Sequence, residues 1–192
     1  MKKIKQINLI ILFLALSNSA FSQTNNISNK WVQLGYFGEN ITHYGLSVGY
    51  GYAFWHSFKK KKKSHLQQLY VETNLPFFIH PGNQLVFCFV PELGYRYTKN
   101  SNWYFQFTIG TGVLRTFYLA KTFEADGNGR FKKIPMAGKW SLGSSFSLGF
   151  GKSISKEKGL SVLTQFRLIN EHFYNQKMLL RPTFQLVILK NI

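Results

Sequence analysis

The sequence has few acidic residues, one cysteine and no long apolar run after its first residues. Its 192 residues include 7 Asp and Glu against 24 Lys and Arg, which gives a formal net charge of +17. The single cysteine, Cys88, cannot form a disulfide within the chain. A membrane-spanning helix needs about 20 apolar residues in a row, and no such run follows residue 22. These shortages exclude an internal disulfide and a helical membrane domain.

The N-terminus has the pattern of a signal peptide. A basic start is followed by an apolar run over residues 9–16, and then by the small residues Ala20 and Ser22 at spacings typical of a cleavage site. As a helix, this run would cover only about 12 Å of the roughly 30 Å of membrane hydrocarbon. We therefore predict a signal peptide at residues 1–22, cleaved near Ser22, and a single domain at residues 23–192.

The excess of positive charge narrows the classes of partner. A strongly basic protein commonly contacts nucleic acid, anionic lipid or phosphorylated glycolipid. Because the predicted signal peptide exports the chain, we expect no nucleic-acid partner. Anionic lipids and glycolipids of the cell envelope are the expected electrostatic partners.

The strongest pattern is an alternation of large apolar and small residues with a period of two. In residues 140–154 the even positions are mostly large and apolar, and the odd positions are all Ser or Gly. Residues 42–55 and 103–113 alternate in the same way. Successive side chains of a strand point to opposite faces, so each segment reads as a strand with one apolar face. A face of Ser and Gly suits the inside of a narrow barrel whose apolar face meets lipid, whereas a soluble sandwich exposes more polar residues.

Eight such segments follow one another along residues 23–192, separated by stretches that favour turns. We predict an all-β fold, an eight-stranded antiparallel up-and-down transmembrane β-barrel with a side-chain-filled lumen, because an even number of strands closes without an edge. The longest connection, 121–136, contains the hairpin tip 126–129, into which we expect the flanking strands to continue. The predicted strands are 30–38, 42–57, 65–79, 84–98, 103–120, 137–154, 160–171 and 179–190.

These features resemble the small eight-stranded outer-membrane barrels of the OmpX-like and OmpA membrane-domain-like families. The similarity is one of pattern over residues 23–192, and the last segment carries Phe184, Leu186 and Ile188 in one parity, as the assembly signal of these families does. It departs from them in ending on Ile192 rather than on an aromatic residue. The resemblance implies a monomer in the outer membrane of a Gram-negative bacterium, placed there by the barrel-insertion machinery. Its termini would lie in the periplasm and connection 121–136 outside the cell.

The parity of the strands directs several charged side chains into the lumen. We expect Glu72 and Glu92 to face Arg167 and Arg181 across it, with Arg96 below, because isolated carboxylates in a narrow interior are costly. Such a cluster is either a gate or paired-carboxylate active site, or a structural plug, and we favour the plug.

A second resemblance concerns enzymes that remove acyl chains from lipid A. Phe166-Arg167 followed by His172-Phe173-Tyr174-Asn175 is similar to the Phe-Arg…His-x-Ser-Asn stretch of the lipid A deacylase family. Tyr174 stands where that family has its nucleophile, so we expect no enzymatic activity, no catalytic residues and no cofactor. The five histidines show no metal-ligand spacing, so we expect no metal site either.

Basic residues gather on or near the long outer connection: Lys121, Arg130, Lys132, Lys133 and Lys139. They could contact the phosphates of lipopolysaccharide, or they could simply be the solvated side chains of a hairpin. The sequence favours a structural, adhesive or envelope-stabilising role without catalysis. A lipid A-modifying enzyme and a narrow channel are the alternatives. The run of lysines at 59–63 would lie at the periplasmic rim, either against anionic headgroups or as a charged turn.

Overall fold

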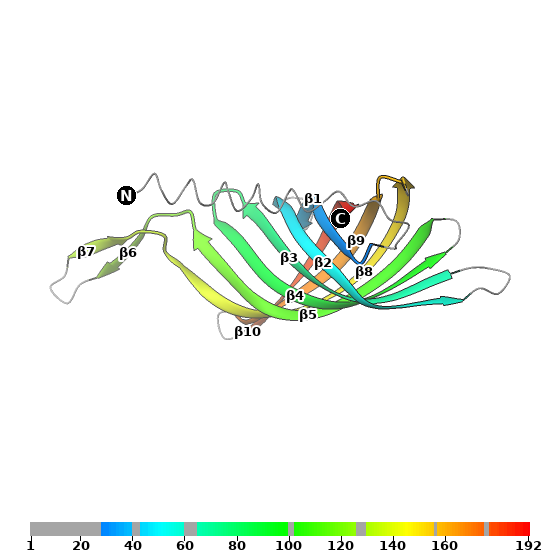
Figure 1. Cartoon of the computed structure of the whole chain (residues 1–192). Coiled ribbons are helices and arrows are strands. Elements are labelled where there is room, and N and C mark those ends of the chain that lie inside the picture. Colours follow the sequence, from blue (N-terminus) through cyan, green and yellow to red (C-terminus); the bar gives the residue numbers. More distant parts are fainter. Residues whose placement is uncertain are drawn as a thin grey trace, which may run out of the picture.

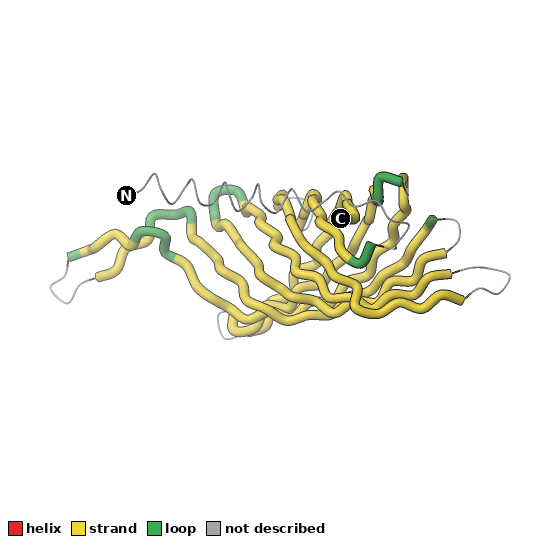
Figure 2. The backbone as a smooth tube through the Cα atoms, in the orientation of Figure 1, coloured by secondary structure: helices red, strands yellow, loops and turns green. Residues whose placement is uncertain are grey.

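The computed structural model describes residues 28–39, 43–59, 65–99, 102–125, 130–155, 157–174 and 177–192. Over these ranges the chain consists of strands joined by short turns (Figure 2). The predicted signal peptide and its cleavage site lie outside the described residues, as do Lys60 to Lys63, and those predictions stand as they are. No helix in the described ranges is long and apolar enough to cross a membrane.

Eight long strands close into one barrel. Each pairs antiparallel with the next long strand, and β1 pairs with β10 to complete the ring (Figure 1). The predicted eight-stranded up-and-down architecture is confirmed, and no strand end differs from the predicted one by more than three residues. The strands are β1 (Lys30–Glu39), β2 (His43–Lys59), β3 (His65–His80), β4 (Gln84–Lys99), β5 (Trp103–Tyr118), β8 (Gly138–Ser155), β9 (Leu160–Tyr174) and β10 (Lys177–Asn191).

A small hairpin projects beyond one end of the barrel, at the left of Figure 1. Its strands, β6 (Thr122–Ala125) and β7 (Phe131–Ile134), form a separate two-stranded sheet. The predicted hairpin is therefore present in this connection, but its strands form a sheet of their own and do not continue β5 and β8 directly. Pro135 has no amide hydrogen and Met136 has a φ of 55°, so the β5–β8 ladder ends at Phe117 and Gly138 and does not run on into the β6–β7 ladder. The expected topology places this end of the barrel outside the cell, so we call it the outer end; the opposite end, where β1 starts and β10 finishes, is called the periplasmic end.

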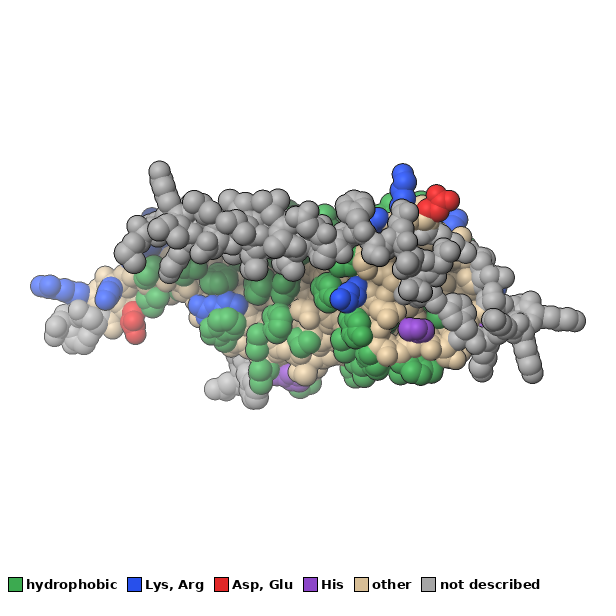
Figure 3. Space-filling model, viewed as in Figure 1, with side chains coloured by type: hydrophobic (Ala, Val, Ile, Leu, Met, Phe, Trp, Pro, Cys, Tyr) green, Lys and Arg blue, Asp and Glu red, His purple; other side chains and the backbone are tan. Residues whose placement is uncertain are grey.

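Side chains alternate between the two faces of the barrel wall, as the period of two predicts. Along β4, inward residues are buried and most of the residues between them are exposed. Leu46, Ile109 and Ile188 are 62%, 57% and 53% exposed on the outward face. Apolar side chains cover much of the visible wall (Figure 3). An apolar surface this extensive suits lipid rather than water, as in the predicted transmembrane barrel.

Glycines on the inward face make room for large aromatic rings. A Cβ atom on Gly51 would lie 2.1 Å from Cε2 of Trp31, and one on Gly151 would lie 2.2 Å from Cζ of Tyr104. These rings belong to an apolar cluster that fills the periplasmic half of the lumen. The Gly-rich faces seen in the sequence are therefore sockets for side chains from other strands, and the lumen is filled as predicted.

Candidate functional site

The barrel encloses most of the acidic residues of the chain. Four of the seven Asp and Glu residues are buried in the lumen: Glu39, Glu72, Glu92 and Glu171. None of the four is more than 4% exposed. They form two layers, each built around one arginine. We call these the middle layer (Glu72, Glu92 and Arg167) and the outer layer (Glu39, Glu171 and Arg181).

The middle layer is centred on Glu92. Nη2 of Arg167 donates to Oε2 of Glu92 at 2.7 Å, and Thr108 donates to the same oxygen at 3.0 Å. Ser145 donates to the other oxygen. Glu72 lies directly opposite Glu92 in the β3–β4 ladder, and its Oε1 is 3.9 Å from Nη2 of Arg167. The predicted contact between this glutamate pair and Arg167 is present, with Glu92 as the closer partner.

The outer layer places Arg181 between two carboxylates. Nη1 of Arg181 donates to both oxygens of Glu39, at 2.9 and 3.2 Å. Its Nε and Nη2 donate to Oε2 of Glu171, at 2.9 and 2.7 Å. Ser141 donates to the remaining oxygen of Glu171 at 2.6 Å. Charge-assisted contacts of this kind are the strongest hydrogen bonds in proteins, so this layer closes the outer half of the lumen firmly.

Arg96 lies apart from both layers, towards the periplasmic end. Its guanidinium carbon is 4.4 Å from the ring centroid of Trp31 and about as close to two tyrosines, at 5.1 Å for Tyr70 and 5.0 Å for Tyr104. Its Nε donates to Gln106 at 3.0 Å. Arg96 is therefore held by aromatic faces, in the position below the glutamates that the sequence predicts.

The prediction that Arg181 faces Glu72 and Glu92 is wrong. In the β9–β10 ladder Arg167 pairs with Thr183, whereas Arg181 lies one inward step closer to the outer end. It meets Glu39 and Glu171 there, two residues that the sequence interpretation did not place in the lumen. Parity could have found both, since Glu171 follows Arg167 by four residues on β9 and Glu39 extends the inward series of β1 by one step.

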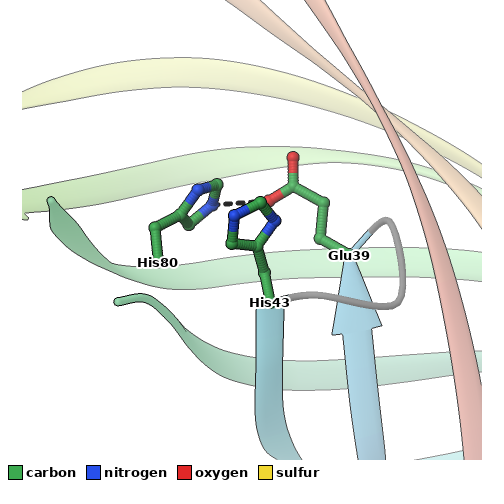
Figure 4. A group of neighbouring side chains, drawn as sticks. All are labelled: Glu39, His43 and His80. Atoms are coloured by element: carbon green, nitrogen blue, oxygen red, sulfur yellow. Dashed lines mark hydrogen bonds and ion pairs between the residues drawn. The ribbon is translucent and has the colours of Figure 1, made fainter. Parts of the chain in front are cut away.

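Two histidines join Glu39 at the outer mouth of the barrel. Glu39, His43 and His80 come from the ends of β1, β2 and β3 and point towards one another (Figure 4). Nε2 of His80 lies 2.7 Å from Oε2 of Glu39, and the two imidazole rings stack with their centroids 3.7 Å apart. We call these three residues the mouth cluster. The expectation of no metal-ligand grouping rested on spacing in the sequence, which does not reveal neighbours across a barrel.

The basic residues of the outer connection divide into three sets. Lys121 and Lys133 line a cleft of about 320 Å³ at the base of the β6–β7 hairpin. Arg130 and Lys132 are exposed farther along the hairpin. Lys139 does not belong with them, because its Nζ lies 4.0 Å from Oε1 of the buried Glu171 and its side chain is largely buried. The inward parity of β8 explains this placement.

A serine–histidine pair lies on the lipid-facing side of the wall. Oγ of Ser144 on β8 is 3.2 Å from Nε2 of His172 on β9. Both side chains are half-buried, and both occupy the outward parity of their strands. Sequence reasoning singled out His172 but not Ser144, because the two residues meet only across the ladder.

The fold has counterparts among solved structures. The chain is similar to Neisserial surface protein A (NspA), at 10% identity and a TM-score of 0.57, over 86% of this chain and 98% of that one. It is also similar to the outer-membrane enzyme PagL, at 13% identity and a TM-score of 0.45, over 84% of this chain and 99% of that one. The β-domain of the Bordetella autotransporter BrkA matches at 12% identity and a TM-score of 0.42, over 85% of this chain and 70% of that one. No protein-family model matches the sequence, and no curated protein matches it. The chain has the fold of the small eight-stranded outer-membrane β-barrels.

Proposed function

We propose that this chain is an integral outer-membrane protein whose outer hairpin binds the phosphorylated headgroup of lipopolysaccharide and so stabilises the cell envelope. The single observation that carries the proposal is the cleft at the base of the hairpin. Lys121 and Lys133 line it, and so do the apolar side chains of Leu119 and Met136. A cleft of this composition suits an amphiphile with an anionic headgroup.

The position of the cleft also favours a lipid ligand. It opens where β5 and β8 leave the barrel wall and is lined by Tyr118, whose side chain is exposed, as is that of Trp140 farther along β8. Aromatic residues of transmembrane barrels commonly mark the level of the headgroups. Lys121 and Lys133 would then lie at the depth of the lipid phosphates.

The filled lumen supports a binding role over a channel. The two charged layers and the aromatic rings around Arg96 occupy the barrel from its mouth to its periplasmic half. Passage through the barrel would require these ion pairs to separate. We therefore expect no steady ion current when the barrel is inserted into a planar bilayer.

The test is a binding measurement with the mature barrel refolded in an uncharged detergent. Lipopolysaccharide is titrated by calorimetry into the wild type and into the double variant Lys121→Ala/Lys133→Ala. Each lysine near an anionic surface contributes about 1 kcal/mol, so the double variant should bind roughly 30-fold more weakly.

A matched control removes the same charge from the other end of the barrel. Lys152 and Lys158 lie at the periplasmic end, on β8 and in the turn that follows it. The variant Lys152→Ala/Lys158→Ala should bind lipopolysaccharide as the wild type does. Equal losses in both double variants, or equal binding of lipopolysaccharide stripped of its phosphates, would contradict the proposal.

A second candidate function is hydrolysis of an acyl ester by Ser144 and His172. The hydrogen bond between them favours it, because this geometry lets His172 accept the serine proton as Oγ attacks an ester carbonyl carbon. The imidazole would return that proton to the departing alcohol, and water would then release the acyl group as a free acid. Among the described residues, no carboxylate contacts the His172 ring to orient it. This candidate therefore ranks below lipid binding.

Mass spectrometry of lipid A tests the second candidate. Outer membranes that contain the wild-type barrel should show lipid A lacking one acyl chain, and the Ser144→Ala variant should not. Thr164→Ala is a matched control, since Thr164 is an exposed hydroxyl residue on the same wall of β9. Lipid A that is unchanged by the wild-type barrel would reject this candidate.

A further inference from the structure

The geometry points to a binding site for a divalent transition-metal ion in the mouth cluster, reached from outside the cell. Glu39, His43 and His80 each offer one ligand atom, and these atoms all lie within 4.8 Å of one another. Three adjacent strands of the barrel hold the three residues. The site is therefore formed by the closed wall rather than by a single loop.

The spacing of the ligand atoms is close to that of a coordinated ion. Bonds of about 2.0–2.2 Å to nitrogen and oxygen place the ligands of a tetrahedral zinc ion roughly 3.5 Å apart. Oε2 of Glu39 and Nε2 of His80 are 2.7 Å apart, and the His43 ring stacks on His80 with an interplanar angle of 24°. The three side chains point towards one another, and their ligand atoms all lie within 4.8 Å (Figure 4).

The chemistry of the ligands selects the class of ion. Two imidazoles and one carboxylate suit Zn²⁺, Cu²⁺ or Ni²⁺, whereas Ca²⁺ and Mg²⁺ prefer oxygen ligands throughout. The His₂Glu set is a recurring zinc site with an open fourth position. Glu39 and His80 have side chains only 5% and 13% exposed, so an ion bound to them would be partly shielded from water.

Arg181 fixes the carboxylate of this site from the other side. It donates to Glu39 and is itself held by two hydrogen bonds to Glu171. Partners of this kind orient metal ligands and raise affinity. The arginine charge also limits how strongly the site attracts a cation. We therefore expect an affinity below that of a structural zinc site with several thiolates.

The competing interpretation is a purely structural network in which His80 bonds to Glu39 and no ion enters. His43 separates the two interpretations. Its replacement leaves the contacts of Glu39 with His80 and Arg181 in place, but it removes one metal ligand. A structural network has no zinc affinity for this change to lower, whereas a metal site would lose most of its affinity.

The experiment uses the mature barrel refolded in detergent free of lipopolysaccharide, since lipid phosphates bind cations themselves. Zn²⁺ is titrated in competition with a chromogenic chelator. We expect one Zn²⁺ per wild-type barrel and an affinity at least about 10-fold weaker for His43→Ala and for His80→Ala. His56→Ala is the matched control, because His56 is exposed near the opposite end of β2 and should bind as the wild type does.

Cobalt supplies a second readout that does not depend on affinity. Co²⁺ in a four-coordinate site with two imidazoles absorbs strongly in the visible range, and His43→Ala should lose this band while keeping the heat-dependent gel mobility of a folded barrel. Zinc binding that is absent from the wild type would overturn the proposal. So would equal weakening by His43→Ala and His56→Ala. Because no lipopolysaccharide is present, either result leaves the proposed lipid-binding function untouched.

Discussion

The middle and outer layers of the lumen are built from the same parts but are completed differently. Each has one arginine between two glutamates. In the outer layer, Arg181 donates to both glutamates, and every carboxylate oxygen has a partner within 3.2 Å. In the middle layer, Arg167 donates only to Glu92, and Glu72 stays 3.9 Å away. We therefore expect the two layers to stabilise the barrel unequally, because the geometry of the donors decides how much each carboxylate gains.

The largest effect is expected from breaking the outer layer. Arg181→Met should lower the free energy of unfolding by about 3–5 kcal/mol, because it removes the four hydrogen bonds through which Arg181 holds two buried carboxylates. Urea unfolding in lipid vesicles, followed by tryptophan fluorescence, measures this. Lys190→Met is the control, since it removes one exposed positive charge from the same strand. A loss below 1 kcal/mol for Arg181→Met would show that the layer does not stabilise the barrel.

Breaking the middle layer should cost less. Arg167→Met removes one charge-assisted hydrogen bond to Glu92 and the longer ion pair with Glu72, and Glu92 keeps its bonds from Thr108 and Ser145. We expect a loss of about 1.5–3 kcal/mol, measured in the same unfolding experiment. If Arg167→Met destabilises the barrel more than Arg181→Met does, the middle layer and not the outer layer contributes more to its stability.

Within the middle layer, the two glutamates should behave differently. Glu92→Gln weakens three hydrogen bonds and should cost about 1–2 kcal/mol. Glu72→Gln should leave stability unchanged or raise it by up to about 1 kcal/mol, because it removes a like charge directly opposite Glu92. The two variants make the same chemical change, so each serves as the matched control for the other in urea unfolding. Equal losses would mean that Glu72 has a partner as close as those of Glu92.

The direction of the lumen side chains could be predicted from the sequence, whereas their partners could be predicted only in part. Alternation with a period of two identified all eight barrel strands and the inward direction of Glu72, Glu92, Arg96 and Arg167, because side-chain direction is a local property of a strand. Partnership across the lumen is not local. It depends on the stagger between strands. The observed register places Arg181 beside Glu39 and Glu171 rather than beside the predicted pair, Glu72 and Glu92.

The remaining site features were missed for related reasons. Glu39 was not included because the predicted first strand ended one residue early, at the position where the mouth cluster begins. Ser144 and His172 are 28 residues apart in the chain and meet through the β8–β9 ladder. Lys139 was assigned to the hairpin by its position in the sequence, although its odd parity on β8 already directed it inward. Extending the alternation of inward and outward positions to the ends of the strands would have directed both Glu39 and Lys139 into the lumen.

Replacing Lys139 should have the smallest effect on the free energy of unfolding, and it separates a lysine of the lumen from the lysines of the outer cleft. Its Nζ is 4.0 Å from a carboxylate that already accepts hydrogen bonds from Arg181 and Ser141, so Lys139→Met should cost at most about 1 kcal/mol in urea unfolding. Because this ammonium group faces Glu171 and not the cleft, the same variant should bind lipopolysaccharide as tightly as the wild type. Lys133→Met, which removes an identical charge from the cleft, should show the opposite pattern, with weakened lipid binding and unchanged stability. Matching behaviour of the two variants in both measurements would mean that the lysines of this region act through net charge alone, and that the inward direction of Lys139 has no functional consequence.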